Sequence, residues 1–271
     1  MPSGSVLAFQ PRLLFTGIYL VMGACMIALG VWQLQRADEK IQLQLLADNA
    51  LAAAPLTVGQ YLSTDTDENP VRVTVSGIPL WDRQLLWDNR IYQGKAGYEA
   101  IVPVRVADEL PLVLVNRGWL PPGANRSSLP KIQPSSEPDR ERVSSVMSIE
   151  VTGVLTRPSK GFASGDALSA APWPRVLQYL DYAAIEQAIG EPVLAGLVEP
   201  GGQVTRPIQS ASAAKSPPDN TPIWYFDNWQ PVASGPERHY GYAFQWFAMF
   251  VALTVLYFSL NLRRLKDNSG L

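Results

Sequence analysis

Two long stretches without a charged side chain constrain this sequence more than any other feature. They cover residues 13–35 and 240–262, close to the two ends of the chain. A helix of about 20 apolar residues spans the hydrocarbon core of a bilayer, so each stretch is long enough to cross it. Trp32 stands near the end of the first stretch and Tyr242 near the start of the second, and aromatic rings favour the headgroup level. We therefore predict transmembrane helices at 13–33 and 240–262.

The basic residues that flank these stretches predict their orientation. Arg12 precedes the first stretch, and the second is followed by Arg263, Arg264 and Lys266. Positively charged flanks stay in the cytoplasm. We therefore expect residues 1–12 and 263–271 to be cytoplasmic and 34–239 to be external, which in a bacterium means on the periplasmic side of the inner membrane. The first apolar run is longer than a signal-peptide core and no A-x-A site follows it, so an uncleaved anchor is expected.

The composition of the remaining chain limits its partners and its means of stabilisation. The formal net charge is -2, and nothing in the totals suggests a nucleic-acid partner. A single cysteine cannot form an internal disulfide, so the external part must be held together by a hydrophobic core.

Strand patterns dominate the external part. The first helix is expected to continue to about Ala53, before Pro55. Short apolar or alternating runs bounded by turn residues then predict strands at 71–77, 83–90, 98–106, 110–120, 148–158 and 193–200. A short helix is predicted after Asp181 and before Gly190. Four stretches are expected to be loops: 61–70, 121–145, 161–174 and 201–222. The fold class predicted is an α+β membrane protein, in which two transmembrane helices flank an antiparallel β-rich domain with one or two short helices.

The inventory of reactive side chains excludes several kinds of site. Copper and zinc sites usually take three or four Cys and His ligands, whereas this chain has one of each, and Cys25 lies within the first apolar stretch. No G-x-S-x-G elbow, Walker loop or dinucleotide fingerprint is present. Catalysis by carboxylates alone stays open, because many acidic pairs exist and no spacing singles one out.

A haem iron needs only one or two axial ligands from a protein, and His239 is the only histidine. In a helix, His239 shares one stripe with Tyr242, Ala243, Trp246 and Phe250, a surface that suits a porphyrin. Arg238 or Arg36 could meet its propionates. The alternative is that His239 is an amphipathic residue at the lipid–water boundary. Gln245, inside the second stretch, is expected to form a hydrogen bond to the first helix, whose glycines favour close helix packing.

Four stretches in order resemble the Surfeit locus protein 1 family of cytochrome c oxidase assembly factors. They are LGVWQLQRADEK (29–40), DNRIYQGKAGYEAIVPVRV (88–106), VLVNRGWLPPG (113–123) and NWQPVASGPERHYGYAFQWFAM (228–249). The layout of helix, large external segment and helix is also similar to that of the family.

The resemblance implies a non-enzymatic role in the maturation of haem-copper oxidase, where subunit I acquires haem a with the help of other assembly factors. It also implies His239 as an axial ligand of haem iron. The helical stripe would then place Tyr242 and Trp246, with Arg238, beside the cofactor. Two alternatives remain, a cofactor-free chaperone for an assembly intermediate and a periplasmic enzyme that uses carboxylates. The family motif includes Asn116, Arg117, Gly118 and Trp119. We expect Gly118 to permit a turn after a strand and Trp119 to pack beneath it.

Overall fold

The computed structural model describes residues 5–64, 70–123, 129–130, 132, 148–158, 166–170, 172–200 and 235–266. The chain forms two compact units. One unit consists of Met1–Leu45 and Pro231–Leu271, and the other of Leu46–Gln230. The loop expected at 201–222 lies outside the described residues, and those at 121–145 and 161–174 lie partly outside them.

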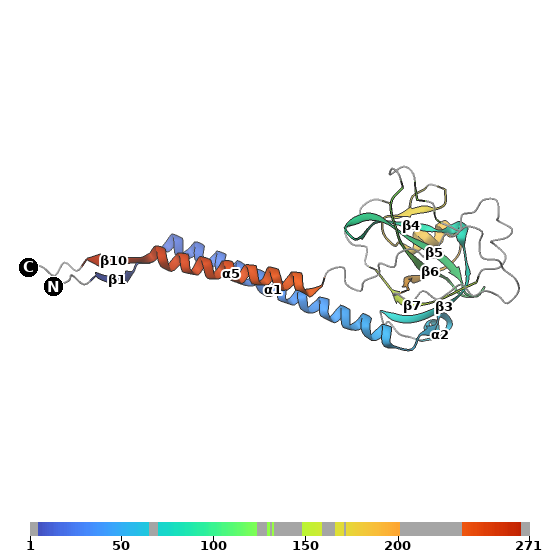
Figure 1. Ribbon diagram of the computed structural model, residues 1–271, viewed down its shortest axis with the longest axis horizontal. Coiled ribbons are helices and arrows are strands. Elements are labelled where there is room, and N and C mark those ends of the chain that lie inside the picture. The colour runs from blue at the N-terminus through green and yellow to red at the C-terminus, as the bar shows by residue number, and fades with distance from the viewer. Residues whose placement is uncertain are drawn as a thin grey trace, which may run out of the picture. The chain divides into compact units, whose positions relative to one another are not determined.

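Two antiparallel helices, α1 (Leu13–Ala52) and α5 (Pro236–Asn261), make up most of the first unit (Figure 1). Both are long and apolar enough to cross a membrane. The end of α1 confirms that this helix continues to the neighbourhood of Ala53. Strand β1 (Ser5–Phe9) precedes α1 and strand β10 (Leu262–Lys266) follows α5. These two strands pair antiparallel, a pairing that the sequence did not predict.

Small residues let α1 and α5 pack closely. A Cβ at Gly30 would lie 2.6 Å from the ring of Phe247, and one at Gly23 would lie 3.0 Å from the ring of Phe250. These glycines therefore receive aromatic side chains of the partner helix, as the expectation of close packing requires.

Hydrogen bonds also join the two helices near the chain termini. The Thr16 hydroxyl lies 2.8 Å from the Tyr257 hydroxyl, and the Tyr19 hydroxyl lies 3.2 Å from that of Thr254. The rings of Tyr19 and Tyr257 stack with their centroids 4.3 Å apart. These contacts fix the register of the helix pair.

The second unit is a β-sheet domain with short helices. Its elements in chain order are β2 (Leu56–Thr57), α2 (Val58–Ser63), β3 (Val71–Pro79), η1 (Trp81–Arg83), β4 (Leu85–Tyr92), β5 (Lys95–Arg105), β6 (Leu112–Leu120), β7 (Ile149–Thr156), β8 (Arg175–Leu177), α4 (Tyr182–Ile189) and β9 (Val193–Glu199). All six predicted strands and the predicted helix α4 are present. The sequence missed β2, β8 and α2, and the expected loop at 61–70 is wrong over its first three residues, which end α2.

The sheet is mixed, so the prediction of an antiparallel sheet is wrong in part. Among the described residues the strand order is β2-β3-β7-β9-β6-β5-β4-β8, and the pairs β2–β3, β6–β9 and β4–β8 are parallel. The consecutive strands β4, β5 and β6 do pair antiparallel with one another. β9 lies between β6 and β7, parallel to β6 and antiparallel to β7. A tight hairpin after β6 could not place a strand parallel to it, and in this chain β7 and β8 come between β6 and β9.

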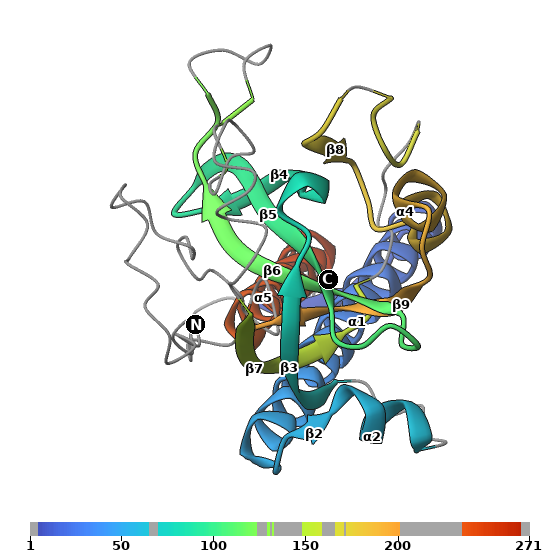
Figure 2. The same ribbon diagram turned by 90° about the vertical axis from the view of Figure 1, so that its right-hand side faces the viewer.

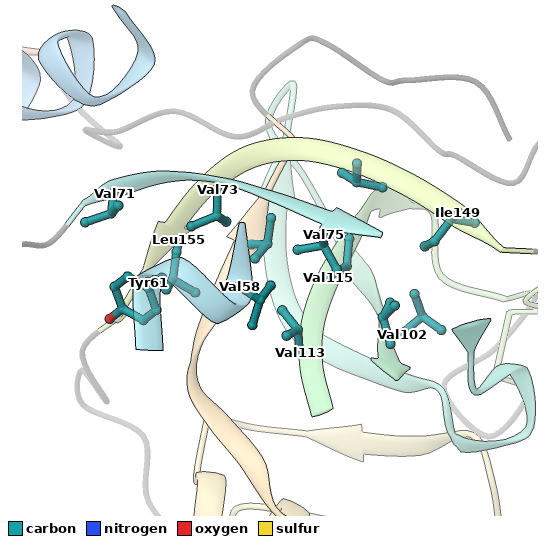
Figure 3. Packing of buried hydrophobic residues seen from close by; sticks show 13 residues of the cluster. Val58, Tyr61, Val71, Val73, Val75, Val102, Val113, Val115, Ile149 and Leu155 are labelled. Atoms are coloured by element: carbon teal, nitrogen blue, oxygen red, sulfur yellow. The ribbon is translucent and has the colours of Figure 1, made fainter. Parts of the chain in front are cut away.

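The end of β3 also pairs with β5, and this pairing closes a ring of five strands, β3-β7-β9-β6-β5. Figure 2 shows these strands curling round a common interior. Side chains of β3 and α2 meet those of β5 and β6 there, including Val75, Val58, Val102 and Val115 (Figure 3). Because alternate strand residues point inward, this valine-rich interior explains the period-2 pattern of β3.

Candidate functional site

His239 lies in the first turn of α5 and is held by a residue of α1. Its ring nitrogen Nδ1 is 2.8 Å from Oε1 of Gln33, 206 positions away in the sequence. The His239 side chain is half-buried. An amide oxygen can only accept a hydrogen bond, so this contact requires a neutral imidazole to carry its proton on Nδ1. The other ring nitrogen, Nε2, is then unprotonated and has no hydrogen-bond partner among the described residues.

The predicted stripe of α5 divides between two surroundings. Ala243 is buried, and Phe250 packs against Gly23 of α1, so these two residues belong to the helix contact. Tyr242 is 52% exposed and Trp246 is half-buried. The aromatic surface available beside His239 is therefore that of Tyr242 and Trp246 rather than the whole stripe.

Charged and aromatic residues surround the same end of the helix pair. Arg238 is exposed, next to His239. On α1, the Arg36 guanidinium pairs with Glu39 and lies 5.8 Å from the ring centroid of Trp32, which is 47% exposed. Gln245 is exposed and, among the described residues, makes no hydrogen bond to α1, so its expected bond is wrong.

The surroundings of His239 fit the expected role of this residue as an axial ligand of haem iron. A ligating histidine usually donates its second ring N–H to a nearby acceptor, which fixes the ring and leaves the other nitrogen to bind the metal. Gln33 provides that acceptor here. Gln33 was not predicted from the sequence as a site residue. Its only signal was a polar side chain at the end of the first apolar stretch, and nothing in the sequence pairs it with His239.

The motif Asn116–Trp119 lies in the second unit, within β6. Gly118 does not form the turn expected after a strand, because β6 continues to Leu120. Between the pairs Ile101–Asn116 and Glu99–Trp119, β6 contains one residue more than β5, and Gly118 has a φ of +103°. The expected turn is therefore a β-bulge that only glycine adopts without strain.

Asn116 connects two buried carboxylates, in what we name the β6 polar network (Asn116, Glu99, Glu199 and Arg90). Its Nδ2 donates to Glu99 Oε2 at 3.0 Å and to Glu199 Oε2 at 2.8 Å, and its Oδ1 accepts from the Gly118 N–H at 2.8 Å. Arg90 Nε lies 3.0 Å from Glu99 Oε1. The network thus joins β4, β5, β6 and β9, and it ties the bulge to them.

The other two residues of the motif are buried as well. The Arg117 guanidinium donates to the Gln84 side chain and lies 5.0 Å from the ring centroid of Trp81. Trp119 is 5% exposed, and its indole N–H donates to the Arg90 carbonyl at 3.0 Å. A Cβ on Gly97 would lie 2.6 Å from the Trp119 ring, so the indole packs directly on that glycine. The expected packing role of Trp119 is confirmed.

Comparison with known proteins decides the family. The family model described as the SURF1 family matches residues 20–251. The chain belongs to the SURF1 family. The resemblance seen in the four sequence stretches is thereby confirmed.

Two curated relatives of the SURF1 family member described here are both named SURF1-like protein. The one from Rickettsia felis is 27% identical over 135 residues, which cover 50% of this chain and 58% of the relative. The one from Monosiga brevicollis is 30% identical over 103 residues, covering 34% of this chain and 40% of the relative. The chain thus spans about half the length of the curated relatives that it matches.

Proposed function

We propose that this protein is a membrane-anchored assembly factor, rather than an enzyme, for haem-copper cytochrome c oxidase. In this proposal it binds haem a through His239 and assists the delivery of haem a to subunit I, or its insertion there, together with other assembly factors. Membership of the SURF1 family supports the oxidase assembly role. The observation that carries the cofactor is the half-buried His239 ring, whose Nδ1 is bonded to Gln33.

Each residue of the helix-pair end has a part in this proposal. His239 Nε2 would bind the iron, and Tyr242 and Trp246 would offer apolar surface to the porphyrin. Arg238, exposed beside His239, would meet a propionate, because a guanidinium pairs well with a carboxylate. When bound, haem a supplies the iron centre that the oxidase later uses, and the protein's own residues hold and orient it.

The membrane setting of the proposal follows from the two apolar helices. We place α1 and α5 across the inner membrane of a bacterium, with the β-sheet domain in the periplasm and the chain termini in the cytoplasm. The basic flanks support this orientation. The lipid bilayer is then a partner of both helices, and no feature of the charge distribution calls for nucleic acid.

The test is the visible spectrum of protein purified from cells that make haem a. The wild type should carry haem at near-stoichiometric occupancy, and His239→Ala should lose most of it, because no second imidazole exists to replace the ligand. Trp246→Ala should lower occupancy less, through lost contact area alone. Both variants should remain in the membrane fraction at wild-type level.

Two outcomes would favour other functions. Wild-type protein that supports oxidase assembly without bound haem would favour a cofactor-free chaperone that stabilises an assembly intermediate. An His239→Ala protein with unchanged spectrum and occupancy would make His239 an ordinary residue of the membrane boundary. Activity on a periplasmic substrate without haem or oxidase would instead favour an enzyme that uses carboxylates.

A further inference from the structure

The contact between Gln33 and His239 has a chemical consequence for which ring nitrogen can bind a metal. A neutral imidazole carries one proton, and the nitrogen without it is the one that ligates. Free histidine side chains in water prefer the proton on Nε2. That tautomer would leave Nδ1, the nitrogen that faces Gln33, as the only one able to bind a metal. The Gln33 amide oxygen, 2.8 Å from Nδ1, draws the proton to Nδ1 instead.

We propose that Gln33 is a positioning residue, which holds His239 in the Nδ1–H tautomer with Nε2 ready to bind iron. The inference rests on the proposed haem-binding function and deepens it. Gln33 does not touch the iron; it acts through the ring of His239.

The surroundings of Gln33 favour such a role over a chance contact. Gly30, one turn earlier on α1, receives the ring of Phe247 of α5, so the two helices are closely packed beside the hydrogen bond. A rigid helix pair keeps Oε1 at a fixed place relative to the imidazole.

The sole histidine makes the tautomer directly measurable. In full-length protein labelled with ¹⁵N-histidine, one imidazole produces all the ring signals, and two-bond ¹⁵N–¹H correlations assign the proton to Nδ1 or Nε2. The spectra should be recorded without haem at about pH 8, above the usual histidine pKa of about 6.5. The wild type should show the Nδ1–H form.

Three variants make the measurement specific. Gln33→Leu keeps a similar volume and removes the acceptor, so its spectrum should change to the Nε2–H form or a mixture. Gln33→Glu keeps an acceptor opposite Nδ1 and should retain a proton there. Gln35→Leu is the matched control, since Gln35 is an exposed glutamine of the same helix, and it should leave the wild-type spectrum unchanged.

Titration of the same proteins with haem a in detergent gives the second readout. Losing a partner of a metal-ligating histidine typically costs 10–100-fold in affinity, so Gln33→Leu should weaken haem a binding by about 10-fold or more. Gln33→Glu and Gln35→Leu should bind within about 3-fold of the wild type, since both leave His239 an acceptor.

The outcomes separate this inference from the proposed function. An Nε2–H wild type, which would result if the Gln33 amide were turned to donate, overturns the inference. So does a Gln33→Leu protein with an unchanged tautomer or unchanged haem a affinity. A wild type that binds no haem a overturns the proposed function, and the positioning role with it, even where the Nδ1–H tautomer is observed.

Discussion

At the scale of single residues, Tyr182 of α4 is half-buried, and its hydroxyl oxygen is buried without a hydrogen-bond partner among the described residues. Burial raises the pKa of the Tyr182 phenol above its ordinary value of 10.0, and the positive charge of Arg157 opposes the rise. The folded state therefore favours the neutral phenol. This contribution to stability is complete below about pH 10 and is lost as the pH rises through the raised pKa of the folded state.

We expect Tyr182→Phe to stabilise the protein by about 0.5–1 kcal/mol at pH 7, since it removes an unsatisfied buried hydroxyl. The variant should also lose less stability than the wild type between about pH 9 and pH 11. Thermal unfolding of the full-length protein in detergent at these pH values measures both effects. A variant less stable than the wild type at pH 7 would show that the hydroxyl has a partner after all.

Single residues also show what the sequence could and could not predict about the site. His239 stood out because it is the only imidazole and lies where charge gives way to an apolar stretch. Gln33 did not stand out, because its meaning depends on a contact across 206 positions. Local patterns identify a residue capable of a chemistry, whereas the partner that orients it is known only once two helices are placed side by side.

At the scale of elements, β6 depends on a glycine that no L-residue can replace without strain. Gly118 has a φ of +103° in the bulge, and an L side chain there costs about 1–3 kcal/mol. Gly118→Ala should destabilise the β-sheet domain by that amount and disturb Asn116, whose Oδ1 accepts the Gly118 N–H. Circular dichroism during thermal unfolding gives the measurement.

Gly59→Ala is the matched control for Gly118→Ala. Gly59 lies in α2, and a Cβ there would meet nothing within 4 Å. Because alanine favours a helix more than glycine does, this change should be neutral or slightly stabilising. Equal midpoints for the two variants would contradict the account of the bulge.

Two glycines of α1 allow a similar comparison between a packed and an open position. Gly30→Ala places a methyl group 2.6 Å from the Phe247 ring, whereas Gly17→Ala meets nothing within 4 Å. Overpacking typically costs about 1–3 kcal/mol, so Gly30→Ala should lower the unfolding temperature in detergent and Gly17→Ala should not. Since Gly30 is one turn from Gln33, the His239 ring signals should also shift in Gly30→Ala alone.

The sequence predicted single helices and strands better than it predicted contacts between distant parts of the chain. The boundaries of α4 follow from local chemistry: Asp181 accepts from the Ala184 N–H at 3.1 Å, and Gly190 ends the helix with a φ of +86°. Short elements such as β8 (Arg175–Leu177) were missed because three residues carry no periodicity. The bulge was missed because a glycine near the end of a strand pattern looks the same whether the strand stops or kinks.

At the scale of the whole molecule, strand pairing was the part that local patterns could not predict. Six strands were placed correctly, yet the parallel pairing of β6 with β9 depends on where the chain returns after the connection that carries α4. The closure of the five-strand ring depends likewise on the contact between the end of β3 and β5. Such long-range pairings are decided by the shared interior and not by any one segment.

The chain termini provide an argument about topology that is independent of charge. The backbone of β1 pairs with that of β10, from Ser5 opposite Lys266 to Phe9 opposite Leu262. Two segments joined by main-chain hydrogen bonds must lie on the same side of a membrane, and the antiparallel course of α1 and α5 agrees with two crossings. In the orientation proposed above, the basic flanks would place that side in the cytoplasm.

We therefore expect alkaline phosphatase fused after Leu271 to be inactive, because this reporter folds only outside the cytoplasm, and the same reporter inserted near Ser210 to be active. Green fluorescent protein fused after Leu271 should fluoresce, since it matures in the cytoplasm. Because the β1–β10 pairing couples the two ends, a reporter ahead of Ser5 should agree with the one after Leu271. Opposite locations for the two ends would contradict both the pairing and the two-crossing topology, whereas a shared external location would contradict only the orientation assigned from the basic flanks.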